Sequence, residues 1–137
     1  MPKLDGVLET SIYTGDMDRA RRFYEEVMAL KPMFSDSRLT AYGVAARSVF
    51  LIFQRGASTD PVTLRGGVIP GHDGSGPLHF AFAIEASELE AWEEQLREHG
   101  VAIEGRMSWR RGGKSIYFRD PDGHVLELAS PGLWENY

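Results

Sequence analysis

Apolar and polar side chains alternate along several short segments of the chain. This predicts half-buried β-strands, because successive strand residues point to opposite faces. Residues 78–84 show the pattern most clearly, since Phe80, Phe82 and Ile84 share one face and small residues share the other with His79. We therefore expect the bulky face to pack under a helix and the small-residue face to be concave.

Two further segments have apolar residues at helical spacing. The first predicted helix spans residues 17–30 and begins after Asp16, a residue type favoured at N-caps. The second begins at a capping box of Ser87 and Glu90 and ends near Gly100, since glycine is favoured just beyond a helix C-terminus. Each helix follows a predicted strand.

The order strand, helix, three strands occurs twice. The predicted strands are residues 7–13, 33–34, 39–44 and 48–53 in the first half, and 78–84, 101–103, 114–118 and 124–128 in the second. This repeat predicts an α+β fold made of two βαβββ modules. The chain, 1–137, is then a single domain with module one at 5–55, a linker without strong periodicity at 56–76, module two at 77–130 and a C-terminal tail at 131–137.

Each module is expected to have an apolar back and a polar front. Alternation places Glu9 and Ser11 on one face of the first strand, and His79 and Tyr117 on the polar faces of their strands. Glu127 lies in an otherwise apolar strand, where a carboxylate is rare unless something pairs with it or binds it. Two such sheets facing each other would line a cleft with Glu9, His79, Tyr117 and Glu127.

One imidazole and two carboxylates in one cleft suit a divalent metal that prefers nitrogen and oxygen ligands. Glu9, His79 and Glu127 would leave coordination positions open for water and substrate, as catalysis requires. Their negative charges favour Mn²⁺, Fe²⁺ or Ni²⁺, and Zn²⁺ is also compatible. The alternatives are a structural role for His79 and an ion pair between Glu127 and an arginine such as Arg119.

The composition narrows the partners and the compartment. The chain has 137 residues and a formal net charge of −5, whereas nucleic-acid binding normally needs a basic face. It has no cysteine, which excludes disulfides, thiolate metal ligands and a cysteine nucleophile. Because no apolar signal core or membrane-length run is present, we expect a cytoplasmic protein that acts on a small molecule, with neither nucleic acid nor a membrane as its partner.

Two motifs carry a resemblance to a known family. Residues 76–82, Gly-Pro-Leu-His-Phe-Ala-Phe, and residues 117–128, Tyr-Phe-Arg-Asp-Pro-Asp-Gly-His-Val-Leu-Glu-Leu, resemble motifs of the vicinal oxygen chelate superfamily. This superfamily includes glyoxalase I, extradiol dioxygenases, fosfomycin-resistance thiol transferases and bleomycin-resistance proteins. Residues 16–24 resemble its first-helix signature. The resemblance implies that the two modules form a curved mixed sheet around a metal cleft.

The resemblance also implies a ligand set. His79 and Glu127 match the ligand positions of the superfamily directly, and Glu9 stands where a histidine is usual. Leu51 stands where glyoxalase I has a further carboxylate ligand, so the pattern is closer to the fosfomycin-resistance enzymes and the dioxygenases. Tyr117 matches a cleft tyrosine of both groups, which would orient or protonate the substrate.

The basic run at residues 106–114 precedes the third strand of module two. The resemblance implies that this region supplies cations for an anionic substrate, as in fosfomycin-resistance enzymes. Trp109, Arg110 and Lys114 are therefore candidate substrate-binding residues, together with Ser11 on the face of the first strand. The alternative is a solvated loop.

The leading interpretation is a metal-dependent enzyme of lyase, isomerase or thiol-transferase type. Glu9 and Tyr117 are its candidate catalytic residues, with Glu9 serving either as a metal ligand or as a general base. A second interpretation is a metal-free protein that sequesters a ligand, like the bleomycin-resistance proteins, since the acidic net charge suits a cationic drug. A third is an Fe(II) extradiol-type dioxygenase. A homodimer is expected, because chains of this size commonly expose half a cleft.

Overall fold

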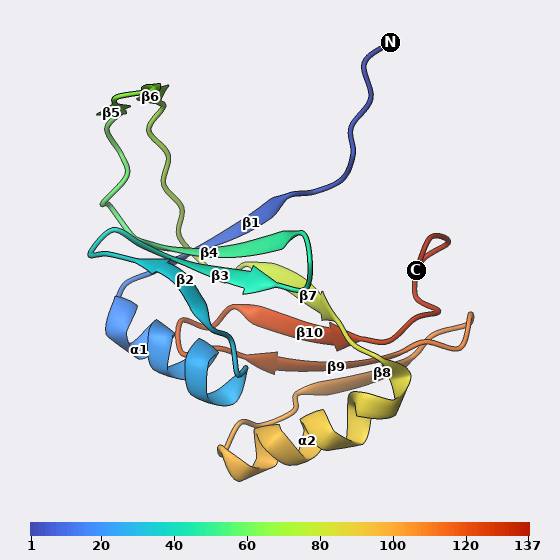
Figure 1. Cartoon of the computed structure of the whole chain (residues 1–137). Coiled ribbons are helices and arrows are strands. Elements are labelled where there is room, and N and C mark those ends of the chain that lie inside the picture. Colours follow the sequence, from blue (N-terminus) through green and yellow to red (C-terminus); the bar gives the residue numbers. More distant parts are fainter. The chain divides into compact units, whose positions relative to one another are not determined.

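The computed structural model describes residues 1–137 and divides into two compact units. Unit 1 is Met1–Ser75 and unit 2 is Gly76–Tyr137. Each unit contains a four-stranded sheet with a helix after its first strand (Figure 1). The α+β fold with two βαβββ modules is therefore confirmed, and each unit is described by itself.

Unit 1 has its sheet in the strand order β1-β4-β3-β2. The first strand is parallel to the last, and the remaining neighbours are antiparallel. The elements in chain order are β1 (Glu9–Thr14), α1 (Met17–Arg22), a π-helical turn (Phe23–Val27), β2 (Pro32–Ser35), β3 (Leu39–Val44) and β4 (Ser48–Gln54).

Unit 2 repeats this topology with the strand order β7-β10-β9-β8, in which β7 is again parallel to the last strand. The elements in chain order are β7 (His79–Ala83), a 3₁₀ turn (Ala86–Glu88), α2 (Leu89–Glu98), β8 (Gly105–Ser108), β9 (Lys114–Arg119) and β10 (Val125–Ala129). The two sheets therefore match element for element.

The apolar back of each sheet forms its core. In unit 1, Tyr24 is fully buried, and its ring centroid lies 4.9 Å from that of Phe50 on β4. In unit 2, Leu96 of α2 is fully buried, as are the alternate residues Leu126 and Leu128 of β10. Burial of such side chains contributes about 1.5–3 kcal/mol each, so the helices are held mainly by packing.

The first helix is shorter than predicted. Asp16 caps it as expected, since its carboxylate accepts the backbone N–H of Arg19 at 3.0 Å. The predicted end at residue 30 is wrong, because the last turn widens to π geometry and ends at Val27. Ala29 then adopts a left-handed conformation with φ of 55°, which reverses the chain before β2.

Two predictions near α2 are also wrong. Ser87 lies inside the 3₁₀ turn, and Glu88 at the N-cap of α2 makes no side-chain capping bond, so no capping box forms. The strand predicted at residues 101–103 begins at Gly105 instead. Val101 closes the helix by donating its N–H to Leu96 at 2.8 Å, and pairing with β9 starts only beyond it.

The linker is more ordered than predicted. It contains an antiparallel hairpin of β5 (Val62–Leu64) and β6 (Gly67–Ile69), which extends from the four-stranded sheet of unit 1 (Figure 1). The hairpin is followed by His72, whose Nδ1 lies 2.8 Å from the Tyr13 hydroxyl. Neither α1 nor α2 has the length and the hydrophobicity of a membrane span.

Candidate functional site

Strand pairing brings three chemically active side chains to one face of the unit 2 sheet. Glu127 on β10 lies opposite Tyr117 on β9 and Ala81 on β7 in the ladder. His79 lies two residues before Ala81, so alternation places it on the same face. We call this side the front face, and we call His79, Tyr117 and Glu127 the Glu127 cluster.

The carboxylate of Glu127 has a different partner on each oxygen. The Tyr117 hydroxyl donates to Oε1 at 2.9 Å, and Oε2 lies 3.4 Å from Nε2 of His79. The Glu127 side chain is only 6% exposed, whereas that of His79 is 53% exposed. Burying a carboxylate this deeply is costly unless it is hydrogen-bonded or paired, so its partners define the local chemistry.

The alternative pairing of Glu127 with an arginine is not observed. Arg119 instead forms an ion pair with Glu104 at 3.0 Å and donates to the Gly123 carbonyl at 2.9 Å. It also lies at the end of β9, where it is exposed. The partners of Glu127 are therefore His79 and Tyr117.

Hydrogen bonding to the backbone sets the tautomer of His79. Its Nδ1 lies 2.9 Å from the Val125 carbonyl oxygen, which can only accept, so Nδ1 carries the proton. In the neutral ring, Nε2 then presents a lone pair towards Glu127 Oε2. A nitrogen donor fixed by such a bond and a neighbouring carboxylate oxygen are the donor types that divalent transition metals use.

The Tyr117 hydroxyl remains a hydrogen-bond donor at neutral pH. Burial raises the pKa of Tyr117, and the hydrogen bond to Glu127 raises it further. The ring centroids of Tyr117 and His79 are 6.3 Å apart. Tyr117 is thus engaged with the carboxylate rather than directed away from it.

The same register in unit 1 shows which side chains stand at equivalent positions. Glu9 pairs with Val49 as His79 pairs with Val125. Leu51 lies two residues after Val49 on β4, as Glu127 lies two residues after Val125 on β10, so Leu51 occupies the position that corresponds to Glu127. Unit 1 therefore carries a leucine in place of the second donor, and Glu9 is its only carboxylate at these positions.

No group of three or more His, Cys, Asp or Glu side chains that could hold a metal occurs in the structure. Of the predicted ligands, His79 and Glu127 are brought together, and Glu9 belongs to unit 1, as does Ser11. The three-ligand site therefore stays a prediction. The donor set nevertheless fits a divalent metal, because an imidazole nitrogen and a buried carboxylate oxygen lie 3.4 Å apart on one face.

The predicted substrate-binding residues of the basic run are not brought together. The Trp109 indole N–H donates at 2.7 Å to the hydroxyl of Ser115, which shares the front face with Tyr117. Arg110 lies exposed in the turn after Trp109. Lys114 alternates with Ser115, so β9 aims it towards the back face. Ser115 was missed from the sequence, although its place two residues before Tyr117 was the available signal.

The tight turn at residues 120–124, before β10, is connected by hydrogen bonds to the strand that carries His79. Asp120 accepts the backbone N–H of His124 at 2.9 Å, and Gly123 has φ of 83°, which only glycine adopts readily. His124 is buried and accepts the Leu78 N–H at 2.9 Å, so it connects this turn to the strand that carries His79. His124 is therefore a structural residue of unit 2.

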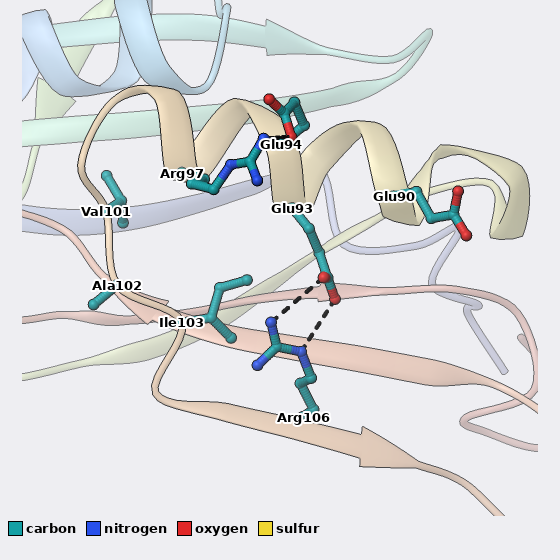
Figure 2. A pocket seen from close by; sticks show the side chains of 8 residues that line it. All are labelled: Glu90, Glu93, Glu94, Arg97, Val101, Ala102, Ile103 and Arg106. Atoms are coloured by element: carbon teal, nitrogen blue, oxygen red, sulfur yellow. Dashed lines mark hydrogen bonds and ion pairs between the residues drawn. The ribbon is translucent and has the colours of Figure 1, made fainter.

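Unit 2 also has a groove of about 530 Å³ between α2 and residues 101–106 (Figure 2). Its charged residues pair with one another, since Arg106 contacts Glu93 at 3.2 Å and Arg97 contacts Glu94. Arg106 follows front-facing Gly105 on β8, so the groove lies on the back face. It is separate from the Glu127 cluster.

Comparison with known proteins gives one family. The model of the Glyoxalase/Bleomycin resistance protein/Dioxygenase superfamily matches residues 6–128. The chain is 33% identical over 134 residues to Metallothiol transferase FosB of Shouchella clausii strain KSM-K16. The aligned region covers 96% of this chain and 84% of that protein. It is 25% identical over 139 residues to Fosfomycin resistance protein FosX of Listeria innocua, with 96% and 94% covered.

Solved structures show the same fold. The structure is similar to the crystal structure of Lactoylglutathione lyase from Agrobacterium tumefaciens, with a TM-score of 0.87 and 26% identity. That similarity covers 98% of this chain and 99% of the other. The chain thus resembles proteins whose names describe two different reactions, so the reaction must be argued from its own side chains.

Proposed function

Since the chain belongs to the Glyoxalase/Bleomycin resistance protein/Dioxygenase superfamily, we propose that it is a metal-dependent transferase that adds a thiol to a small, oxygen-rich substrate. The thiol-transferase type is favoured because FosB of Shouchella clausii is similar over nearly the whole chain. Fosfomycin, named in the similar FosX protein, is therefore the first substrate to assay.

The observation that carries the proposal is the pairing of His79 Nε2 with a buried oxygen of Glu127 at 3.4 Å. An imidazole nitrogen beside a buried carboxylate oxygen is a donor pair that a divalent ion uses and that a protein which only sequesters a ligand does not need. In the proposal His79 and Glu127 hold a divalent ion, with Glu9 as the third ligand. Mn²⁺, Fe²⁺, Ni²⁺ and Zn²⁺ all accept this set of nitrogen and oxygen donors.

A bound divalent ion would polarise a substrate oxygen and stabilise the negative charge that develops on it. In addition of a thiol to an epoxide, the sulfur–carbon bond forms as one carbon–oxygen bond breaks, and the thiol proton ends on the released oxygen. Glu9, if it is not a ligand, would take the proton from the thiol as a general base and return it to the released oxygen. Ser11, Trp109 and Arg110 remain the proposed contacts to an anionic group of the substrate, and Lys114 is no longer proposed because it lies towards the back face.

Metal content and thermal stability test the proposal. Protein purified without chelator should contain stoichiometric divalent metal and should be stabilised by added Mn²⁺, Ni²⁺ or Zn²⁺. His79→Ala and Glu127→Ala should abolish both effects. His99→Ala and Glu135→Ala are matched controls, because these residues lie at the end of α2 and in the exposed C-terminal segment of unit 2.

Activity is then measured as consumption of a thiol, such as glutathione or cysteine, with fosfomycin in the presence of each metal. Turnover that is lost in His79→Ala and kept in His99→Ala supports the proposal. Sub-stoichiometric metal that the cluster variants leave unchanged would sink it. Stabilisation by a cationic drug without metal would favour the sequestering alternative instead. Sedimentation analysis tests the homodimer that we propose as its assembly.

A further inference from the structure

Tyr117 was expected to contact the substrate, yet its hydroxyl is already used. It donates to Glu127 Oε1 at 2.9 Å, and the two residues are direct partners in the antiparallel ladder of β9 and β10. The backbone register places the two residues opposite each other, whatever occupies the front face. A change of occupant would leave the two side chains opposed.

The hydrogen bond divides the carboxylate into two oxygens with different tasks. Oε1 is anchored by Tyr117, and Oε2 is left facing Nε2 of His79 at 3.4 Å. His79 is itself held from behind by the Val125 carbonyl at 2.9 Å. Glu127 and His79 are thus each oriented by a hydrogen bond to the other polar atom of the same side chain, Oε1 in Glu127 and Nδ1 in His79. Residues around a metal site commonly orient its ligands in this way.

The surroundings of Tyr117 hold its hydroxyl in this direction. The Ser115 side chain lies two residues away on the same front face and interacts with the Tyr117 hydroxyl. The Trp109 indole, which can only donate, fixes the Ser115 hydroxyl at 2.7 Å. The hydroxyls of Ser115 and Tyr117 therefore both have partners within unit 2.

We propose that Tyr117 is a positioning residue, which anchors Oε1 of Glu127 so that Oε2 and His79 Nε2 are presented together to a divalent ion. The proposal rests on the proposed function for the ion itself. It replaces the acid role expected of Tyr117, because the hydroxyl already directs its hydrogen to Glu127 Oε1 and not towards a substrate.

The test compares Tyr117→Phe with Tyr137→Phe. The Tyr137 hydroxyl donates to the backbone carbonyl of Ala129 at 2.7 Å, so this control loses a tyrosine hydrogen bond to the end of the same strand but not to Glu127. Metal affinity is measured by competition with a chromogenic chelator. Tyr117→Phe should weaken it about 10–100-fold, the usual effect of losing an outer partner of a metal ligand, and Tyr137→Phe should leave it unchanged.

Ser115→Ala provides a second variant that keeps the tyrosine, and it should weaken metal binding by a smaller factor. If Tyr117→Phe binds metal as tightly as the wild type but loses kcat, the acid role is correct and the positioning role is overturned. The orientation of Glu127 in crystal structures of metal-free wild type and Tyr117→Phe gives a readout that needs no metal. Failure of the wild type to bind any divalent ion refutes the proposed function, whereas an unrotated carboxylate in Tyr117→Phe refutes the positioning role.

Discussion

Replacing Gly113 with alanine should destabilise unit 2, because Gly113 lies against the backbone of the C-terminal segment. A Cβ built on Gly113 would come within 2.7 Å of the Gly132 carbonyl carbon and 2.9 Å of the Ser130 carbonyl oxygen. Ordinary contact begins only at 3.4 Å. The added methyl group must therefore push residues 130–132 away from the loop that follows β8.

The magnitude follows from the contacts that this shift disturbs. Overpacking costs about 1–3 kcal/mol, and the Gly113 N–H to Gly132 hydrogen bond of 3.2 Å contributes about 1 kcal/mol more. A loss of about 2–4 kcal/mol is therefore expected. With about 2.1 cal/mol/K of unfolding entropy per residue and 137 residues, the melting temperature should fall by roughly 7–14 °C.

Gly66→Ala is the matched control, since a Cβ there would meet nothing within 4 Å. Its melting temperature should stay within about 2 °C of the wild type, or rise slightly as the unfolded chain loses freedom. Both variants are compared by differential scanning calorimetry. If Gly113→Ala and Gly66→Ala have the same melting temperature, the close approach of Gly113 to residues 130–132 does not limit stability, and the reasoning is refuted.

Two further predictions concern the cores. Burial, and to a lesser extent the hydrogen bond to Glu25, raises the pKa of Tyr42 above its ordinary 10.0. As the pH rises, Tyr42 therefore ionises in the unfolded chain before it does in the folded protein. The contribution of Tyr42 to stability should be complete below pH 10 and decline above it, and urea unfolding between pH 8 and 11 should show a smaller decline for Tyr42→Phe. Leu96→Ala, in the fully buried position of α2, should cost about 2–5 kcal/mol in urea unfolding. Leu64→Ala, on the exposed hairpin, should cost less than about 0.5 kcal/mol, and equal losses would contradict the assignment of the core.

Much of the fold could be predicted because burial follows a simple period in this chain. The alternation around Phe80 and the helical spacing around Tyr24 both led to elements that the structure contains. The errors arose where the backbone overrides the pattern. Ala29 turns the chain in a left-handed conformation that no residue pattern announced, and the N–H of Val101 is used by the helix when its side chain suggested a strand.

The site was predictable in part for the same reason. Glu127 stood out as a carboxylate in an apolar strand, and its alternation with Leu126 and Leu128 placed it on the front face. Its actual partners depend on the register between β9 and β10, which one sequence does not specify. The alternative of an ion pair with Arg119 was excluded only when the ladder placed Tyr117 opposite Glu127.

The matched register of the two sheets has a consequence for how chemistry is distributed over the chain. Leu51 and Glu127 have equivalent places in their ladders, as do Glu9 and His79. The backbone therefore provides equivalent positions in both sheets. At these positions the two halves differ in their potential metal ligands only through the side chains present there. A change such as Leu51→Glu would alter the number of donors without altering the fold. In this chain, a single substitution at either position would therefore change the donor set while the strand register that orients the side chain stays the same.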